Sequence, residues 1–449
     1  MALRLSSEEL TAALGRRLGG SVHDLRRLSG GASRVTSAFE LDTGDGAPRA
    51  LIVQMDRAGT APRGRVRMEG ALLRAAAGAG APVPGVIALG EGDELGASWL
   101  VVERLEGETI PRKILRDDEW ATARHALTGQ AGRALAAIHT IDPATIEGLA
   151  PTDPLGDPLP FLDALGEVRP ALELGVRWLA AHRPPDGPRV TVHGDYRLGN
   201  FLVGPDGLRG VLDWELAHTG NPAEDIGWLC APAWRFGGGG EVGGFGTLPE
   251  LLDAYSAAGG EAVTAAGVHW WQVYATIKWA TVCALQASAH LSGATRSVEL
   301  ATIGRRVCES EWDLLGLLGT PPPATAGPLA ADGPTAPFGR PTASELVEAV
   351  GEYLNDAMER SEDGARFEAR VARNALGIAE RELRLGPALA DAHATRLAGL
   401  GFSGDAALAA ALRSGALDAE WESIAPVLAA SARDQLLVAN PSYLPAAIG

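Results

Sequence analysis

The stretch that most constrains this chain is residues 190–215, which read VTVHGDYRLGNFLVGPDGLRGVLDWE. Residues 190–192 and 201–203 have the apolar, β-branched and aromatic character of short buried strands. The GPDG sequence between 201–203 and 208–212 favours a tight turn, so we predict that these two segments form a hairpin. A hairpin at this point would fold the end of the stretch back onto its polar middle.

The loop before this hairpin gathers polar side chains of complementary chemistry. It holds His193, Asp195, Arg197 and Asn200, and the hairpin returns Asp213 to the same place. Phosphoryl transfer needs a carboxylate facing a hydroxyl, hard oxygen ligands for Mg²⁺ and a cation near the phosphate. A polar loop that merely caps two buried hairpins is the alternative. The complete set favours a kinase-type fold.

Two segments, HGDYRLGN at 193–200 and LDWE at 212–215, resemble the aminoglycoside phosphotransferase and choline kinase family of small-molecule kinases. The resemblance extends over residues 20–318. It implies an α+β, two-lobed protein-kinase-like fold, with a small β-rich N-lobe and a helical C-lobe. It also implies an enzyme that uses ATP and Mg²⁺ to phosphorylate an alcohol group of a small-molecule acceptor.

The same resemblance implies a role for each polar residue of the stretch. Asp195 orients or deprotonates the acceptor hydroxyl, Arg197 meets the γ-phosphate, and His193 supports the loop. Asn200 and Asp213 hold Mg²⁺.

Two further polar residues are expected to be structural. The resemblance implies that Asp225 braces the backbone of the catalytic loop from below. His139, at the end of an apolar-periodic helix, is expected to be a packed core histidine.

A glycine-rich turn lies where the phosphate-covering loop of such a kinase belongs. Gly30, Gly31 and Ser33 stand between two predicted strands and can bring backbone N–H groups and a hydroxyl to phosphate oxygens. A plain turn that joins two strands is the alternative.

The third strand, residues 50–55, departs from the family pattern. The family presents a Lys or Arg here, paired with the phosphates and with a Glu on the next helix, which is Glu69. The position of that cation holds Gln54. Since a charge-assisted hydrogen bond is roughly twice as strong as a neutral one, we expect weaker ATP binding or slower turnover. Arg57 could compensate, whereas Arg49 should face the other side of the strand.

The resemblance also places the lobe boundary and the contact with the adenine base. The backbone from Glu103 to Leu105 corresponds to the hinge that hydrogen-bonds adenine, although an edge strand ending in a loop is the alternative. Beyond the kinase-like part, the composition of TPPPATAGPLAADGPTAPFGR predicts a semi-rigid linker. The predicted parts are an N-lobe at 1–107, a C-lobe at 108–319, a linker at 320–341 and a helical domain at 342–449.

Composition narrows the class of protein. The net charge of −17 argues against general binding to nucleic acid or to an anionic membrane, because both need basic surface. The three cysteines are far apart and show no metal-binding spacing, which fits a reducing cytoplasm. The most apolar run, 265–293, is interrupted by polar residues and predicts a buried helix instead of a membrane span.

The acceptor and the partners are not specified by these motifs. The wording GGASR, HGDYRLGN and LDWE is most similar to kinase domains fused to, or encoded beside, acyl-CoA dehydrogenases, which phosphorylate hydroxyacyl-CoA thioesters. An antibiotic phosphotransferase acting on aminoglycosides or macrolides is the first alternative. A weakly active nucleotide-binding scaffold, motivated by Gln54, is the second. The helical domain resembles small uncharacterised bacterial domains and is expected to bind a protein partner or a second copy.

Overall fold

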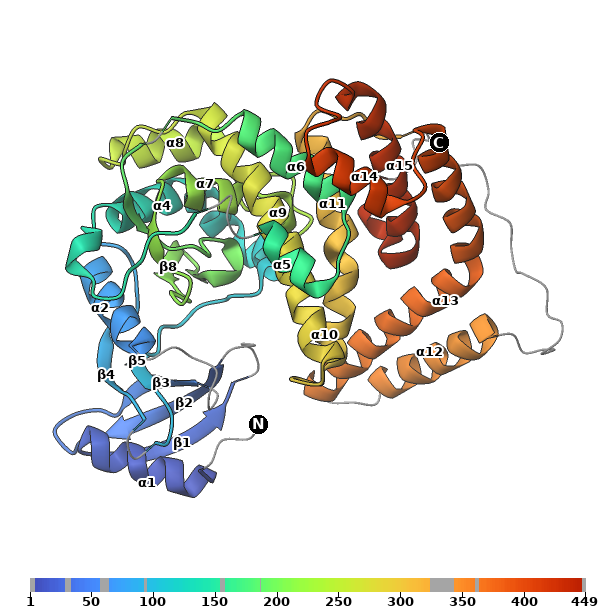
Figure 1. Cartoon of the computed structure of the whole chain (residues 1–449). Coiled ribbons are helices and arrows are strands. Elements are labelled where there is room, and N and C mark those ends of the chain that lie inside the picture. The colour runs from blue at the N-terminus through green and yellow to red at the C-terminus, as the bar shows by residue number, and fades with distance from the viewer. Residues whose placement is uncertain are drawn as a thin grey trace. The chain divides into compact units, whose positions relative to one another are not determined.

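The computed structural model describes eight stretches of the chain, namely residues 5–28, 34–56, 64–92, 95–153, 158–185, 187–323, 343–359 and 363–445. They form two compact units (Figure 1). The first unit comprises Met1–Thr152 with Pro185–Trp271, and the second comprises Asp153–Pro184 with Gln272–Gly449. The predicted phosphate turn with Gly30, Gly31 and Ser33, and most of the predicted linker, lie outside the described residues.

The first unit begins with a five-stranded antiparallel sheet in the order β1-β2-β3-β5-β4. Side chains alternate across β3, as the pleat of a strand requires. Leu51, Val53 and Met55 are buried with residues of α1, whereas Ile52 packs on the core beyond the other face. Gln54 shares the face of Ile52 and therefore points away from α1. The elements are α1 (Ser7–Leu18), β1 (Ser21–Arg27), β2 (Arg34–Asp42), β3 (Arg49–Asp56), α2 (Arg65–Gly78), β4 (Val86–Gly90) and β5 (Trp99–Glu103).

The helix α1 starts and stops where its sequence indicates. The Ser6 side chain accepts a hydrogen bond from the Glu9 N–H, and the Glu9 carboxylate accepts one from the Ser6 N–H, which completes a capping box. The helix ends at Gly19, whose φ of 72° is left-handed. Leu10 and Leu14 lie on the face that covers the sheet.

The rest of the first unit surrounds the polar loop with two small sheets and several helices. β7 pairs with β8 in antiparallel fashion, with Phe201 opposite Val211, which confirms the predicted hairpin. β6 pairs with β9 in the same way. The elements are α3 (Pro111–Arg116), η1 (Asp118–Trp120), α4 (Ala121–His139), η2 (Pro143–Thr145), β6 (Val190–Val192), η3 (Leu198–Asn200), β7 (Phe201–Gly204), β8 (Gly207–Val211), β9 (His218–Gly220), α7 (Ala223–Cys230), η4 (Pro232–Trp234), α8 (Leu248–Ala257) and the start of α9 (Ala265–Leu291).

The second unit consists of helices in the residues that the structure describes. Its elements are α5 (Pro158–Leu165), α6 (Pro170–Ala181), the remainder of α9, α10 (Val298–Ile303), η5 (Gly304–Arg306), α11 (Val307–Leu317), α12 (Ala343–Glu359), α13 (Asp363–Gly399), α14 (Asp405–Arg413), α15 (Trp421–Ala439) and η6 (Pro441–Tyr443). The C-terminal region is therefore all-α, as predicted.

The helices after the predicted linker share a core with helices before it. Leu174 of α6 and Leu315 of α11 are buried together with Leu408 of α14 and Leu428 of α15. Polar contacts reinforce this apolar cluster, because Arg413 of α14 pairs with the side chains of Glu173 and Asp163. No motif in the sequence indicates this common core.

The long helix α13 differs from its prediction. The sequence predicts separate helices at 364–384 and 387–398, but α13 runs without a break through Pro387. A proline inside a helix costs roughly 3 kcal/mol because it removes one backbone hydrogen bond and crowds the preceding turn. Packing of α13 against α12 and α15 outweighs that cost.

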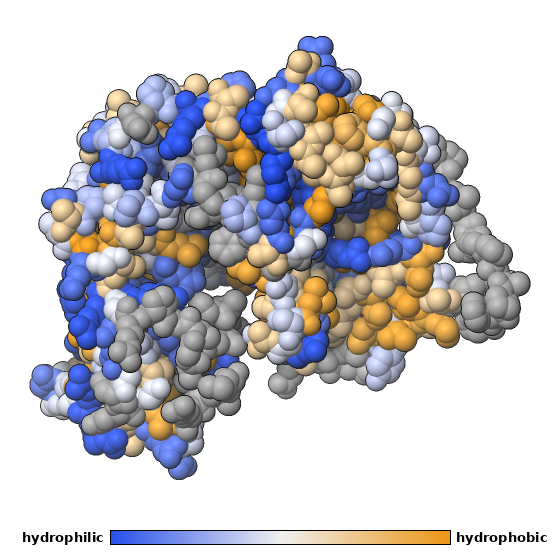
Figure 2. All heavy atoms as spheres, in the orientation of Figure 1, coloured by the Kyte–Doolittle hydropathy of each residue, from blue (hydrophilic) through white to orange (hydrophobic). Residues whose placement is uncertain are grey.

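Apolar side chains gather on the outside of the second unit. Figure 2 shows hydrophobic residues over α12 and α13 on the face in view. Leu346, Val350 and Tyr353 lie on one stripe of α12 and are each about half exposed or more, as is Phe367 of α13. No helix within the described ranges combines the length and the apolar character that crossing a membrane requires.

Helices α4 and α8 approach each other most closely at Gly132. A Cβ atom at this position would lie 2.8 Å from the Leu251 carbonyl oxygen and 2.9 Å from the Ala254 Cβ. At Gly129, one turn earlier on α4, the nearest atom to such a Cβ is a terminal nitrogen of the Arg133 side chain, at 3.3 Å. The helix crossing therefore requires glycine at 132 but not at 129.

We predict that Gly132→Ala lowers the free energy of unfolding by about 1–3 kcal/mol, because the extra methyl forces the two helices apart. The matched variant Gly129→Ala should leave stability unchanged or raise it by up to about 1 kcal/mol through better helix propensity. Chemical denaturation of both variants measures the difference. Equal stabilities would contradict the close crossing of α4 and α8.

Candidate active site

The polar loop after β6 is held in place by one buried carboxylate. Asp225, in the first turn of α7, accepts hydrogen bonds from the backbone N–H of His193 at 2.7 Å and of Gly194 at 2.9 Å. His139 Nε2 lies 3.2 Å from the same carboxylate. Gly194 has a φ of 80°, and a Cβ there would meet the Leu216 carbonyl oxygen at 2.3 Å. The expected bracing role of Asp225 agrees with this geometry.

Asp195 stands in the middle of the loop and is fixed by three donors. Its Oδ1 accepts from Arg197 Nε and from Trp228 Nε1, both at 2.8 Å. Its Oδ2 accepts from Asn200 Nδ2 at 2.6 Å. The side chain is buried yet polar on every side, so its orientation is set before any substrate binds.

Arg197 contacts the carboxylate of Asp195, whereas His193 contacts its backbone N–H. The Arg197 guanidinium lies over the Trp234 ring, 4.7 Å from its centroid, and remains partly exposed. His193 is fully buried: its Nε2 donates to the Leu212 carbonyl at 3.1 Å and its Nδ1 accepts from the Asp195 N–H at 3.2 Å. Burial lowers the pKa of His193, which keeps the ring neutral. His193 therefore shapes the loop, while Arg197 keeps a partly exposed guanidinium.

Asp213 follows β8 and has an unusual backbone and an unusual pKa. Its φ of 65° is left-handed, which a residue with a Cβ seldom adopts. Burial raises its pKa to about 7, and the negative charges of Glu215, Asp195 and Glu69 act in the same direction. Arg197 opposes them only in part. The position therefore accumulates negative charge that a cation would relieve.

The donor set fits a magnesium ion that is completed by substrate phosphates. Asn200 donates its amide nitrogen to Asp195, which leaves its amide oxygen as a ligand atom for the metal. Mg²⁺ is commonly held by one or two carboxylates together with phosphate oxygens. Within the described residues, no group of three or more His, Cys, Asp or Glu side chains is placed to hold a metal alone.

The N-lobe side of the site contains a buried ion network that the sequence analysis missed. Glu69 of α2 pairs with Arg34 of β2, with 2.6 Å between nitrogen and oxygen. Arg34 Nε also donates to Asp56 at 2.9 Å, and Arg65 contacts the same Asp56 oxygen at 2.6 Å. Arg65 lies 3.4 Å from Glu215. Only the register of β2 against β3, which composition does not give, would have pointed to Arg34.

The structure also bears on the two arginines near Gln54 and on the predicted hinge. Arg49 pairs with Glu103 at 3.4 Å on the outer surface, so it faces away from Glu69 as expected, while Arg57 lies outside the described residues. The N–H of Glu103 already bonds to the Gly85 carbonyl, and the N–H of Arg104 bonds to the Ala50 carbonyl. Among the predicted hinge donors this leaves the backbone of Leu105.

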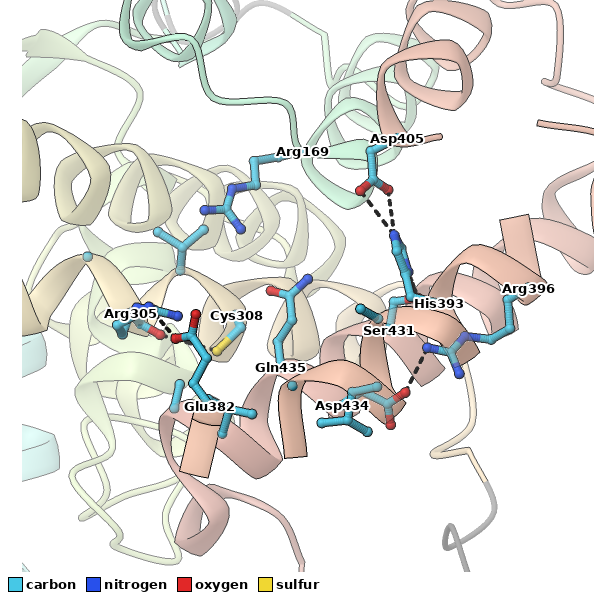
Figure 3. Close-up of a pocket in the computed structure, with 17 residues that line it drawn as sticks. Arg169, Arg305, Cys308, Glu382, His393, Arg396, Asp405, Ser431, Asp434 and Gln435 are labelled. Atoms are coloured by element: carbon cyan, nitrogen blue, oxygen red, sulfur yellow. Dashed lines mark hydrogen bonds and ion pairs between the residues drawn. The ribbon is translucent and has the colours of Figure 1, made fainter. Parts of the chain in front are cut away.

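The second unit contains a pocket with a volume of about 360 Å³. Figure 3 shows Arg169, His393, Ser431 and Gln435 around it. Burial raises the pKa of the Cys308 thiol in its wall to about 12, so this thiol is protonated and unreactive. Its charged groups are already matched in pairs, namely Arg305 with Glu382, Arg396 with Asp434 and His393 with Asp405. We therefore place the candidate active site in the first unit.

Comparison with known proteins agrees with that placement. Residues 24–272, more than half of the chain, match the phosphotransferase enzyme family known as APH. The chain belongs to this family. Residues 359–443 match a family described as a domain of unknown function, DUF6285. The resemblance found in the sequence is thus confirmed, as is the kinase-like fold with a β-sheet N-terminal region and a helical C-terminal region.

Individual relatives are more distant. Acyl-CoA dehydrogenase family member 10 of Mus musculus is 29% identical over 198 residues, which are 41% of this chain and 18% of that protein. The chain spans less than a fifth of the length of the curated relatives it matches.

Two solved structures share the fold. A provisionally named aminoglycoside phosphotransferase of Ralstonia eutropha superposes with a TM-score of 0.54 at 22% identity, covering 71% of this chain and 98% of the other. A choline/ethanolamine kinase family protein of Mesorhizobium loti gives a TM-score of 0.50 at 20% identity, covering 70% and 95%.

We predict that Asp225→Asn lowers the free energy of unfolding at pH 7 by about 2–4 kcal/mol, because buried donors lose a charged acceptor. Burial alone would raise the pKa of Asp225, but hydrogen bonds and charge from His139 and the His193 N–H outweigh burial and lower the pKa. The stabilisation is therefore complete above the unfolded value of 3.8 and fades as the pH falls below it.

Denaturation at pH 7 and pH 3 measures both effects. The control is Asp253→Asn, on the exposed side of α8, which should change stability by less than about 0.5 kcal/mol. An Asp225→Asn protein as stable as the control at pH 7 would show that the carboxylate does not brace the loop.

Proposed function

We propose that this protein transfers the γ-phosphate of ATP to a hydroxyl group of a small molecule. The observation that carries the proposal is the frame around Asp195, whose carboxylate is oriented by Arg197, Asn200 and Trp228. Because the carboxylate is already oriented by its hydrogen bonds, no conformational entropy is lost in orienting it during the reaction. Membership of the phosphotransferase family supports the same reaction class.

In the proposed reaction each side chain has a separate task. Asp195 accepts the proton of the acceptor hydroxyl. The hydroxyl oxygen then bonds to the γ-phosphorus, and the bond from that phosphorus to the bridging oxygen breaks, so that ADP leaves. Arg197 faces the charge on the transferred group. Asn200 and Asp213 would hold Mg²⁺, which neutralises charge on the phosphates when bound. His193 keeps the loop in shape through its two ring hydrogen bonds.

The nucleotide is proposed to lie between the sheet and this loop. Gly30, Gly31 and Ser33 would cover the phosphates. The Glu103 carbonyl and the Leu105 backbone would meet the adenine, because the N–H groups of Glu103 and Arg104 are engaged elsewhere.

For the acceptor we propose a hydroxyacyl-CoA. The proposal rests on the sequences of the motifs GGASR, HGDYRLGN and LDWE and on the similarity to acyl-CoA dehydrogenase family member 10 over 198 residues. Aminoglycosides and macrolides are the competing acceptors, and ATP binding without any transfer is the behaviour of a nucleotide-binding scaffold. One assay separates these alternatives.

Location and partners complete the proposal. Three buried cysteines that form no disulfide within the described residues support a reducing compartment, and we assign the protein to the cytoplasm. The exposed apolar stripe of Leu346, Val350 and Tyr353 on α12 supports contact with another protein or with a second copy of the chain.

We predict that Asp195→Asn lowers the turnover number by at least about a hundredfold, the usual effect of losing a general base. The full chain is incubated with Mg-ATP and a panel of hydroxyacyl-CoAs, aminoglycosides and macrolides, and phosphorylated products are measured by mass spectrometry. The matched control is Asp206→Asn, on the exposed turn of the same hairpin, which should retain activity.

The panel also decides the acceptor. Product from hydroxyacyl-CoA alone supports the proposal, and product from an antibiotic replaces the proposed acceptor. If the wild type and Asp195→Asn behave alike on every compound, the assignment of Asp195 as base fails.

A further inference from the structure

The sheet face that carries Gln54 also carries Arg34. Thr36 lies opposite Gln54 across the strand pair, and Arg34 lies opposite Asp56. Residues two apart on a strand point to the same face. Arg34 therefore lies on the same face as Thr36 and Gln54, and it is the diagonal neighbour of Gln54 across the strand pair. Arg34 comes directly after the predicted phosphate turn in the sequence. Its side chain is 6% exposed, so its surroundings define where it points.

Arg34 makes the ion pair that the family pattern assigns to a cation on β3. A terminal nitrogen of Arg34 lies 2.6 Å from Glu69 Oε2, and Glu69 is itself 3% exposed. Burial disfavours the charge of Arg34, but the hydrogen bonds and charges of Glu69 and Asp56 outweigh burial and raise its pKa. Arg34 therefore stays charged at any pH at which the protein is folded.

We propose that Arg34 supplies the positive charge that β3 lacks and contacts the phosphates of bound ATP, with Glu69 as its positioning partner. This inference rests on the proposed phosphotransferase function and names the residue that meets the nucleotide phosphates. A guanidinium has five N–H donors in a planar fork. Arg34 engages Asp56 through Nε and Glu69 through one terminal nitrogen, and among the described residues its other terminal nitrogen remains for a phosphate oxygen.

The surrounding charges are consistent with this task. Asp56 is shared with Arg65, which lies 2.6 Å away, so Arg34 is not its sole partner. The chain contains only two lysines, Lys113 and Lys278, and neither belongs to the sheet. Arg34 lies on the strand next to the one where the family has its cation. Its side chain is longer than that of lysine and has more hydrogen-bond donors, so it can take the place of that cation. Gln54 is then no handicap for nucleotide binding.

The test moves the charge from one strand to the other. Titration calorimetry of the full chain measures the affinity for Mg-ATP and for adenosine, which has no phosphate. Arg34→Gln should weaken Mg-ATP binding by about tenfold to a hundredfold, the effect of losing a charged hydrogen bond, and leave adenosine binding unchanged. The double variant Arg34→Gln with Gln54→Lys restores the charge on β3 and should recover most of the lost affinity.

The control and the contrary outcomes are distinct. Arg49→Gln removes a half-exposed arginine of β3 and should leave both affinities unchanged. An unchanged Mg-ATP affinity in Arg34→Gln, or an equal loss for adenosine, overturns the role of Arg34 while the proposed function stands. A wild type that binds neither compound overturns the proposed function itself.

A second variant covers the case in which Arg34→Gln does not fold. Arg34→Lys keeps the charge, but one ammonium cannot meet Asp56, Glu69 and a phosphate together. It should therefore weaken Mg-ATP binding and leave adenosine binding unchanged. Equal affinities for Mg-ATP in this variant and the wild type would overturn the inference.

Discussion

The active-site geometry depends on the buried carboxylate of Asp225. Burying an ion is costly, and here three donors compensate the cost: two consecutive backbone N–H groups and a histidine. The N–H groups belong to the start of the polar loop, and the histidine belongs to the end of α4. One side chain of α7 thus joins a helix, a strand end and a loop. Asp195 is the next residue after these two N–H groups, so its backbone position follows from theirs.

Around this anchor lie several carboxylates that arginines partly neutralise. Arg34 and Arg65 are shared among Glu69, Asp56 and Glu215, and Arg197 serves Asp195. Burial raises the pKa of Asp213 to about 7, and the neighbouring carboxylates Glu215, Asp195 and Glu69 act in the same direction. A cation bound beside Asp213 would relieve the negative charge that these carboxylates share.

The part of the fold that follows local rules could be read from the sequence. The hairpin around Pro205 and the polar loop are each encoded within a few residues. What the sequence could not give depends on residues distant in the chain. The Arg34–Glu69 pair requires the register of two strands, and the core shared by Leu174, Leu315 and Leu408 requires three dimensions. Local propensity also failed at Pro387, where packing outweighs the proline.

The core shared by α6, α11, α14 and α15 bears on the modularity of this chain. A family boundary at residue 359 suggests a cassette that evolution, or an engineer, could detach. Yet detaching it would expose Leu174 and Leu315 to water and leave the buried carboxylate of Glu173 without Arg413. The boundary between the two matched families is therefore not a boundary in packing, and a chain shortened there would leave an apolar surface on α6 and α11.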